Sequence, residues 1–444
     1  MWVRTQLKIG WLDLLAGAIS TVYGADRDKL TREVEAYWDT SGDTIAAYSV
    51  RSGFDLLLQA MDLNPGDEVI FSALNVKGMV KIVRRQGLVP VPVDLDIGHM
   101  APSLERLKAA ITPCSRVLVV AHLFGTRLDL DPVIDLAREH GILIAEDCAQ
   151  AFNGRSYPGH PKADVSMFSF GPIKTATALG GALIRVRDAG SCGALRERMR
   201  AIQADYPIQA NRQQRKRVMQ FAGLKIVTSR LALQAIHRIF AARGSDYEDA
   251  IANKVRNVAP LKSLKNMRYR PSRAMLAMMA RRLRRFREET LDQRTTKGRR
   301  LRESLGDAVV MPALDNTHHD YWVFPILVDD PPAFIRAMRA EGFDTSNAPR
   351  SQAVPAPPDR PQLEASIAVR VLADMIIVPC YPGMPDTEIE REARVIKAIA
   401  QRVGSSRTRA YADAVPAPVA APPEPETERG AEAPETERGA ETPQ

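Results

Sequence analysis

Cysteine is scarce in this chain of 444 residues, and the four that occur lie far apart. They are Cys114, Cys148, Cys192 and Cys380, with no CxxC pair and no cluster of histidines beside them. This spacing argues against a disulfide framework and gives no sign of a zinc site. We therefore expect a protein of a reducing compartment, the cytoplasm, without a metal centre.

Long apolar runs are also missing. No stretch of about 18 to 20 uninterrupted apolar residues occurs, so we expect no membrane-spanning helix. The moderately apolar segment Ile9–Tyr23 follows Arg4 and Lys8 and superficially resembles a signal peptide, but Asp13 and dispersed glycines interrupt it. An amphipathic N-terminal helix that packs on a partner subunit is the favoured interpretation.

Large apolar residues are almost absent from the end of the chain. From Arg409 the composition shifts to Ala, Pro, Glu and Thr, and the segment PETERGAE at 425–432 recurs at 434–441. Such a segment cannot bury a core, so we expect residues 405–444 to form a disordered tail.

The residues with the clearest chemical meaning follow two short apolar runs. The runs Ile142–Ala145 and Val165–Phe168 are typical of strands buried on both faces. Asp147 follows the first and Lys174 the second, and open α/β sheets place their ligands at such carboxyl ends. A lysine that forms a Schiff base and a carboxylate that keeps a pyridine nitrogen protonated suit pyridoxal phosphate. The pattern therefore indicates a pyridoxal-phosphate site, although many strands end in Asp or Lys without a catalytic role.

The same region resembles the DegT/DnrJ/EryC1/StrS family of sugar aminotransferases, which are fold-type-I pyridoxal-phosphate enzymes. The family pattern is Asp-x-Ala-Gln-Ala, then Phe-Ser-Phe-x-x-x-Lys, then Gly-Gly. This chain has DCAQA at 147–151, FSFGPIK at 168–174 and GG at 180–181. The resemblance runs from about residue 47 to 186 and resumes more weakly from 267 to 400.

The resemblance implies a role for each motif residue. Asp147 would pair with the pyridine nitrogen, and Lys174 would be the Schiff-base lysine. Gln150 would hydrogen-bond the ring oxygen, Ala149 would lie against a ring face, and Ser169 would hold the phosphate.

A further cofactor-binding segment is expected at Ser52, Gly53 and Phe54, where the family has a Ser-Gly-Thr phosphate loop. Phe54 replaces the threonine and removes one hydroxyl donor, so binding would rest on backbone amides at a helix start. The alternative is an ordinary helix cap at Ser52. Val76 and Leu179 also depart from the family, which often has a stacking aromatic residue and usually a glutamate there. These departures indicate an unusual substrate or weaker cofactor binding.

Strand and helix patterns alternate regularly, which predicts an α/β fold with a mostly parallel, doubly wound sheet in the large domain. We expect an N-terminal arm at 1–44 and a large cofactor-binding domain at 45–265. A linking helix over Pro271–Leu305 would lead into a smaller C-terminal α+β domain, the two together spanning 266–404.

Positive charge is concentrated in the middle of the chain, which has a net charge of +8. Between Arg196 and Arg302 basic residues outnumber acidic ones by roughly 20. Residues 189–265 are the least family-like and form a predicted basic helical insertion. Three interpretations stay open for it: a solvated basic face at a dimer interface, a site for an anionic nucleotide or phosphate, and docking to an anionic membrane. Nucleic acid is disfavoured because no binding motif accompanies the charge.

The resemblance implies a pyridoxal-phosphate-dependent aminotransferase that moves an amino group, from glutamate by family habit, to a nucleotide-linked keto-sugar. It also implies a homodimer, because the fold class builds its site from two subunits. Lys174 disfavours the related dehydratases, which have histidine at this position. Two alternatives remain open: a degenerate member that acts as a binding or regulatory protein, and an aminotransferase for a lipid-linked or otherwise unusual ketone at a membrane surface.

Overall fold

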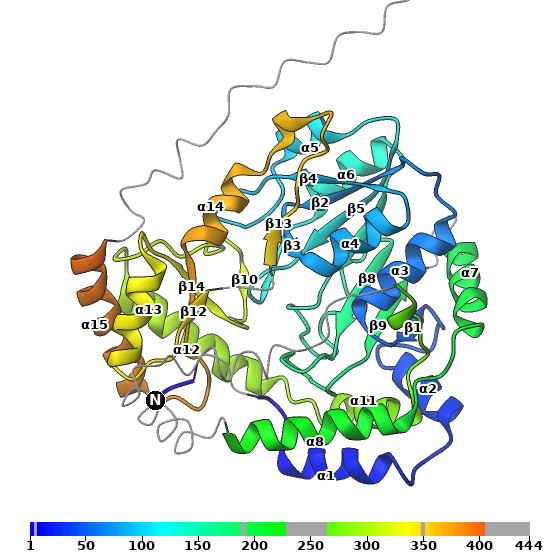
Figure 1. The fold of residues 1–444 in the computed structure, drawn as a ribbon, viewed down its shortest axis with the longest axis horizontal. Coiled ribbons are helices and arrows are strands. Elements are labelled where there is room, and N and C mark those ends of the chain that lie inside the picture. The colour runs from blue at the N-terminus through cyan, green and yellow to red at the C-terminus, as the bar shows by residue number, and fades with distance from the viewer. Residues whose placement is uncertain (4–6, 188–191, 228–263, 348–350, 405–444) are drawn as a thin grey trace, which may run out of the picture.

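A seven-stranded sheet forms the centre of the large domain (Figure 1). The computed structural model describes residues 1–3, 7–187, 192–227, 264–347 and 351–404, so the predicted tail and much of the basic insertion lie outside it. Across the sheet the strands are β1 (Thr44–Ala47), β9 (Ala182–Val186), β8 (Val165–Ser169), β7 (Leu143–Asp147), β5 (Ser115–Ala121), β2 (Glu68–Ser72) and β4 (Val89–Val93). Strands β8, β7, β5, β2 and β4 run parallel, and β9 is antiparallel to both neighbours. The predicted mostly parallel sheet is confirmed.

Helices cover both faces of this sheet because successive strand residues point to opposite sides. Val69 and Phe71 of β2 enter the core under α3, α4 and α7, whereas Ile70 enters the core under α5 and α6. At the β8–β9–β1 end, Phe168 packs under α1, α2 and α11. The large-domain helices are α1 (Trp11–Ser20), α2 (Arg27–Glu35), α3 (Val50–Met61), α4 (Lys77–Arg85), α5 (Leu104–Ala110), α6 (Asp131–Glu139), α7 (Cys192–Ala204), α8 (Asn211–Val227) and α11 (Arg273–Arg284).

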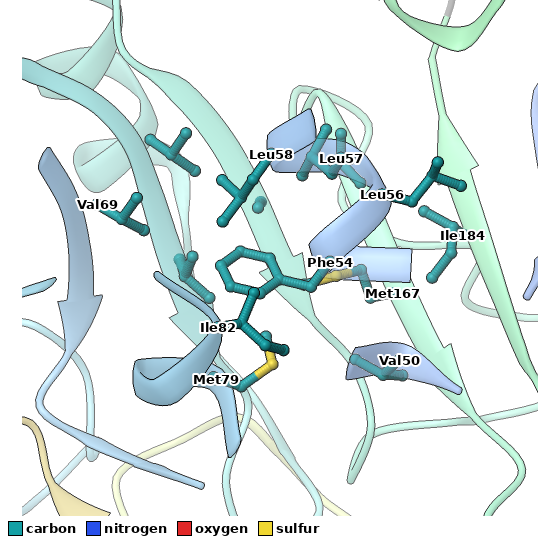
Figure 2. Packing of buried hydrophobic residues seen from close by; sticks show 14 of the residues in the cluster. Val50, Phe54, Leu56, Leu57, Leu58, Val69, Met79, Ile82, Met167 and Ile184 are labelled. Carbon is teal, nitrogen blue, oxygen red and sulfur yellow. The ribbon is translucent and has the colours of Figure 1, made fainter. Parts of the chain in front are cut away.

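Helix α3 starts directly after β1 and packs along the sheet. Its N-cap is Ser49, whose hydroxyl accepts a hydrogen bond from the amide of Ser52 at 3.2 Å. Figure 2 shows its buried face, where the fully buried Phe54 lies among Met79 and Ile82 of α4. The hydrophobic face of α3 therefore fixes where the helix begins and which way its N-terminus points.

The smaller domain has a three-stranded antiparallel sheet in the order β11 (Phe324–Leu327), β14 (Met375–Val378), β12 (Ser346–Asn347). Helices α12 (Glu289–Leu305), α13 (Pro331–Ala340) and α15 (Asp386–Val403) pack on it, and α14 (Ser366–Asp374) lies between the domains. The N-terminus joins this domain, because Trp2 exchanges backbone hydrogen bonds of 2.8 Å with Gly342 and Asp344. Residues 1–44 therefore contact both domains.

Short strand pairs connect the two domains. Strand β6 (Thr126–Arg127) pairs with β10 (His318–His319), and β3 (Leu74–Val76) pairs with β13 (Ser351–Ala353). The single helix predicted over Pro271–Leu305 is wrong, because the structure has two helices there, α11 and α12. Between them lies Phe286, whose ring centre is 5.0 Å from that of Phe152.

Candidate active site

Asp147 and Lys174 lie at the same edge of the sheet. Asp147 is the last residue of β7, Ser169 is the last residue of its parallel neighbour β8, and Lys174 follows in the next loop. A residue of the small domain lies against this lysine: the Nζ of Lys174 is 4.5 Å from the ring centre of Trp322. An amine, a carboxylate and a hydroxyl thus come together where the two domains meet.

Asp147 is buried and incompletely hydrogen-bonded. It is 8% exposed, and its Oδ1 accepts a hydrogen bond from the amide of Ala149 at 2.9 Å. Its Oδ2 accepts none from the described residues. Burial raises the pKa of Asp147, and the Ala149 amide and the positive charge of Lys174 offset that effect only in part. A cationic partner would stabilise such a carboxylate, and a protonated pyridine nitrogen has the required charge.

A buried polar network lies directly behind Asp147, centred on Glu146. The Oε1 of Glu146 accepts hydrogen bonds from the Nε2 of His122, at 2.7 Å, and from the Tyr157 hydroxyl. Its Oε2 accepts one from Ser166 at 2.6 Å. Burial by itself would raise the pKa of Glu146, but the His122 contact and these hydroxyls outweigh it and bring the pKa to about 2. The network therefore anchors the end of β7 with a fixed negative charge.

His122, Glu146 and Cys148 hold their potential ligand atoms within 4.8 Å of one another, a spacing that also suits a metal ion. The Nδ1 of His122 accepts a hydrogen bond from the Leu128 amide at 3.1 Å, and its Nε2 is bound to Glu146. The imidazole nitrogens and the carboxylate oxygens are thus already used by protein donors and acceptors. The cluster is a structural network, and the buried His122 does not face the cleft.

The remaining motif residues lie near Asp147 and Lys174. The Oε1 of Gln150 accepts a hydrogen bond from the Phe124 amide at 2.9 Å, which orients the side chain and leaves its NH₂ group as a donor. Ala149 is half-buried at the end of β7. The hydroxyl of Ser169 accepts a bond from the Gly171 amide at 3.4 Å, so it lies beside the lysine loop.

Ser52, Gly53 and Phe54 lie inside helix α3. Its N-cap is Ser49, so Ser52 and Gly53 belong to the first turn and Phe54 begins the second. Ser52 is buried and donates its hydroxyl to the carbonyl of Met267 at 2.7 Å, and Phe54 is in the core. The Gly53 amide is already bonded to the Ser49 carbonyl at 2.9 Å. The amides without a helical partner at the start of α3 extend only as far as Ser52, so a phosphate bound there would use the first turn, and the role predicted for Ser52, Gly53 and Phe54 stays a prediction.

Ser49 is a further residue of this segment that sequence reasoning did not single out. The amide of Gly181 donates to the carbonyl of Tyr48 at 3.1 Å, and the amide of Phe170 donates to the carbonyl of Gly181 at 3.0 Å. These bonds place the start of α3 beside the end of β8, with the hydroxyl of Ser49 at the helix terminus. The strand end at residue 47 was the available signal, since the helix follows it almost immediately.

The two other departures from the family lie near the same edge. Val76 is 37% exposed and is the residue before α4. Leu179 is fully buried with a left-handed φ of 61°, a conformation that costs a non-glycine residue about 1–2 kcal/mol. Its carbonyl accepts a hydrogen bond from the Nη1 of Arg217 at 2.9 Å, which ties α8 to this loop.

A model of the DegT/DnrJ/EryC1/StrS aminotransferase family matches residues 12–400. The chain is 36% identical over 146 residues to the UDP-N-acetyl-3-dehydro-alpha-D-glucosamine 3-aminotransferase of Acidithiobacillus ferrooxidans, covering 31% of this chain and 39% of that one. It is 35% identical over 147 residues to the GDP-perosamine synthase of Caulobacter vibrioides, covering 32% and 39%. The matched segments therefore span about two fifths of these relatives.

The fold is shared over a larger part of the chain. The PLP-form structure of the putative sugar aminotransferase Spr1654 from Streptococcus pneumoniae superposes with a TM-score of 0.63 at 15% identity, covering 90% of this chain and 98% of that one. At this identity the likeness shows the fold, which is the predicted fold-type-I architecture.

Proposed function

The chain belongs to the DegT/DnrJ/EryC1/StrS aminotransferase family, and we propose that it uses pyridoxal phosphate to transfer an amino group to a nucleotide-linked keto-sugar. We propose glutamate as the donor, by resemblance to the family. Support for the substrate class comes from the two curated relatives, whose names specify a UDP-linked amino sugar and GDP-perosamine.

The meeting of Lys174 and Asp147 at one sheet edge is the observation that carries this proposal. When bound there, pyridoxal phosphate supplies an electron sink for the bonds around the reacting carbon. The donor set fits it, because Asp147 is a buried carboxylate with an open oxygen and Lys174 presents an amine in the adjacent loop.

Each residue then has a defined task. The carboxylate of Asp147 would hold a proton on the ring nitrogen by its charge. The Nζ of Lys174 would hold the cofactor and would serve as the acid and base that moves a proton. The NH₂ group of Gln150 would donate a hydrogen bond to the ring oxygen, and the hydroxyls of Ser169 and Ser49 would hold the phosphate.

The visible absorbance spectrum of the purified protein tests the cofactor and its lysine together. We expect a yellow band that borohydride removes in the wild type and that is absent from Lys174→Ala. Arg84→Ala, an exposed arginine on α4, is the matched control and should keep the band. A wild-type protein that stays colourless with added pyridoxal phosphate would overturn the proposal and favour a binding or regulatory role.

The substrate class needs a separate assay. We expect purified protein to consume glutamate in the presence of UDP- or GDP-linked keto-sugars and to form the corresponding amino sugar. Turnover of free keto-sugars alone would contradict the nucleotide-linked class.

We also propose a homodimer in the cytoplasm. The fold class builds its site from two subunits, and the four cysteines are free thiols, as in proteins of reducing compartments. Analytical ultracentrifugation should give twice the chain mass, and a monomer that is fully active would contradict this.

A further inference from the structure

Helix α1 and the turn after it expose a continuous apolar surface. The outward side chains range from 52% exposed at Trp11 to 75% exposed at Tyr23. The full set is Trp11, Leu12, Leu15, Ile19, Val22 and Tyr23. At about 100° per residue the four helical positions, Trp11, Leu12, Leu15 and Ile19, fall within an arc of roughly 100° and form one stripe, which Val22 and Tyr23 follow in the turn after the helix. We call this stripe the α1 apolar face.

The polar residues of α1 point the other way, into the protein. Asp13 forms ion pairs with Arg281, at 2.8 Å, and with Arg282, at 2.6 Å. Ser20 donates its buried hydroxyl to the carbonyl of Gly17 at 2.8 Å. A surface helix of a soluble protein normally buries its apolar stripe and exposes its polar one. Helix α1 buries Asp13 and Ser20 beside Leu14 and exposes its other large apolar side chains, which indicates that something apolar covers its outer face.

The orientation of α1 is held firmly. A Cβ placed on Gly17 would lie 2.8 Å from the Sδ of Met278, so α1 and α11 approach each other closely at this glycine. Rotating α1 to hide its apolar face would break this contact and leave the carboxylate of Asp13 without its two arginines. The apolar face is therefore a built feature of the fold.

An arginine-lined groove runs beside the α1 apolar face. It consists of two adjoining cavities of about 270 and 620 Å³, and both are lined by Arg284 and Arg285. Trp11 and Leu12 line the larger cavity, together with Arg287. Over the two cavities the arginines are Arg281, Arg282, Arg284, Arg285 and Arg287.

The groove has a strong positive excess. Asp13 is the one acidic residue in its lining, and two of the arginines already bind it. Arg285 and Arg287 form no ion pair with any residue that the structure describes. A surface that combines free guanidinium groups with exposed apolar side chains is complementary to an anionic amphiphile.

Helix α8 extends the same surface. It lies beside α1 and α11 along one border of the molecule (Figure 1). Its exposed residues include Arg212, Arg215 and Lys216 in the first half, and Met219 and Ile226 further along. Basic and apolar side chains are thus mixed on the second helix as on the first.

A second copy of the chain is a poor occupant for this surface. A twofold interface centred on it would bring the arginines of both copies together, and Asp13, the acidic residue of the groove, already pairs with Arg281 and Arg282. An anionic bilayer offers phosphate groups to the arginines and acyl chains to the apolar stripe. None of the described helices is long and apolar enough to cross a membrane.

We propose that the α1 apolar face, the α11 arginine groove and the outer side of α8 dock this protein onto a membrane surface that contains anionic phospholipids. The apolar side chains enter the boundary between headgroups and acyl chains, and the arginines bind lipid phosphates. This inference does not depend on the proposed aminotransferase activity.

Vesicle co-sedimentation of the full chain tests the docking. We expect the protein to sediment with vesicles of phosphatidylcholine and phosphatidylglycerol at low salt, and to remain in solution with phosphatidylcholine alone. Raising the salt to 0.5 M should weaken binding, because screening removes the electrostatic part.

Two double variants separate the contribution of the arginines to membrane binding from that of the α1 apolar face. Arg285→Glu with Arg287→Glu should reduce partitioning by roughly 25-fold or more, since each basic residue near an anionic surface contributes about fivefold. Leu15→Glu with Ile19→Glu should abolish binding at all salt concentrations. The matched controls are Lys81→Glu with Arg84→Glu on α4, and Val369→Glu on α14, which change exposed residues elsewhere. Both controls should bind as the wild type does.

Three results would overturn the proposal. One is the absence of sedimentation with anionic vesicles at low salt. Another is equal loss of binding in the controls and in the groove variants, which would show a nonspecific charge effect. The third is conversion of a wild-type dimer to a monomer by Leu15→Glu with Ile19→Glu, which would show that a second copy covers the face. Circular dichroism melting of each variant establishes that it is folded.

Discussion

The Nζ of Lys174 lies 4.5 Å from the centre of the Trp322 indole ring, so a residue of the small domain contacts the proposed catalytic lysine. The Nε1 of the same indole donates a hydrogen bond to the carbonyl of Ile173 at 3.3 Å. The fully buried Arg294 also links the lysine loop to the small domain. Its Nη1 donates a hydrogen bond to the hydroxyl of Thr175 at 3.3 Å, and its Nη2 lies 2.6 Å from the carboxylate of Asp320. The relative position of the two domains therefore sets the position of the lysine loop.

Shortening Trp322 should lower activity through Lys174. A cation over an indole contributes about 0.5–2 kcal/mol, so we expect Trp322→Ala to reduce kcat by roughly 3- to 30-fold. Trp322→Phe keeps an aromatic face and should lose at most a few fold. Steady-state kinetics with a saturating amino donor measures both. Equal losses in the two variants would show that the aromatic contact is not what matters.

Replacing Asp147 by Asn should lower the activity of the protein and raise its stability. Without a charge for the ring nitrogen, we expect kcat to fall by roughly 10²- to 10⁴-fold. Because burial raises the folded-state pKa of Asp147 above its unfolded value, its stabilising contribution is present below about pH 4 and is lost as the pH rises. The cofactor-free Asp147→Asn variant should therefore melt a few degrees higher than the wild type at pH 7. A lower melting temperature would contradict this account of the site.

Replacing Glu146 by Gln should have the opposite effect on stability. The folded-state pKa of Glu146 is lowered from 4.5 to about 2, so its contribution is full above about pH 4.5 and is lost as the pH falls toward 2. Removing this buried acceptor should cost about 2–4 kcal/mol at pH 7. Melting temperatures between pH 2.5 and 7 test this: the gap between wild type and Glu146→Gln should narrow on acidification. A difference in melting temperature that stays constant with pH would show that the variant loses stability through altered packing and not through the lost charge.

Ser49 and Ser52 should respond differently to alanine. A hydrogen bond to a charged group contributes about 1.5–3 kcal/mol, so Ser49→Ala should raise the dissociation constant for pyridoxal phosphate by roughly 10- to 100-fold. Ser52→Ala removes the bond to the Met267 carbonyl and should lower stability by about 1 kcal/mol with little change in that constant. Spectrophotometric cofactor titration separates the two. The reverse ranking would assign the phosphate contact to Ser52, as the sequence predicts.

Replacing two helical glycines by alanine should change the stability of the protein in opposite directions. A Cβ on Gly53 would lie 2.3 Å from the Cδ1 of Ile184, so Gly53→Ala should destabilise the protein by about 1–3 kcal/mol. Gly223 in α8 has nothing within 4 Å of that position, and Gly223→Ala should stabilise it by about 0.5–1 kcal/mol through helix propensity. Urea unfolding measures both changes. Similar values for the two would show that α3 does not pack on β9 as closely as described.

Much of the large domain was predictable because its signals are local. The strands at 143–147 and 165–169 are short apolar runs, and a strand end places the next polar residue at the edge of the sheet. Asp147, Lys174, Ser169 and Gln150 were predicted in this way and by their motif. The start of α3 at Ser49 was not predicted, because the Ser-Gly pair at 52–53 matched a family pattern, and only the packing of Phe54 shows that these residues already lie inside the helix.

The sequence by itself determined the alternation of elements, the candidate acid and lysine and the family, since these depend on residue order and periodicity over short distances. The tertiary structure alone decided that Trp322 covers Lys174, that Glu146 and His122 form a closed network, and that α1 turns its apolar residues outward. Each of these depends on residues far apart in the chain. Periodicity shows that a helix has an apolar side, but only its neighbours, here the two arginines that bind Asp13, determine which side faces the protein.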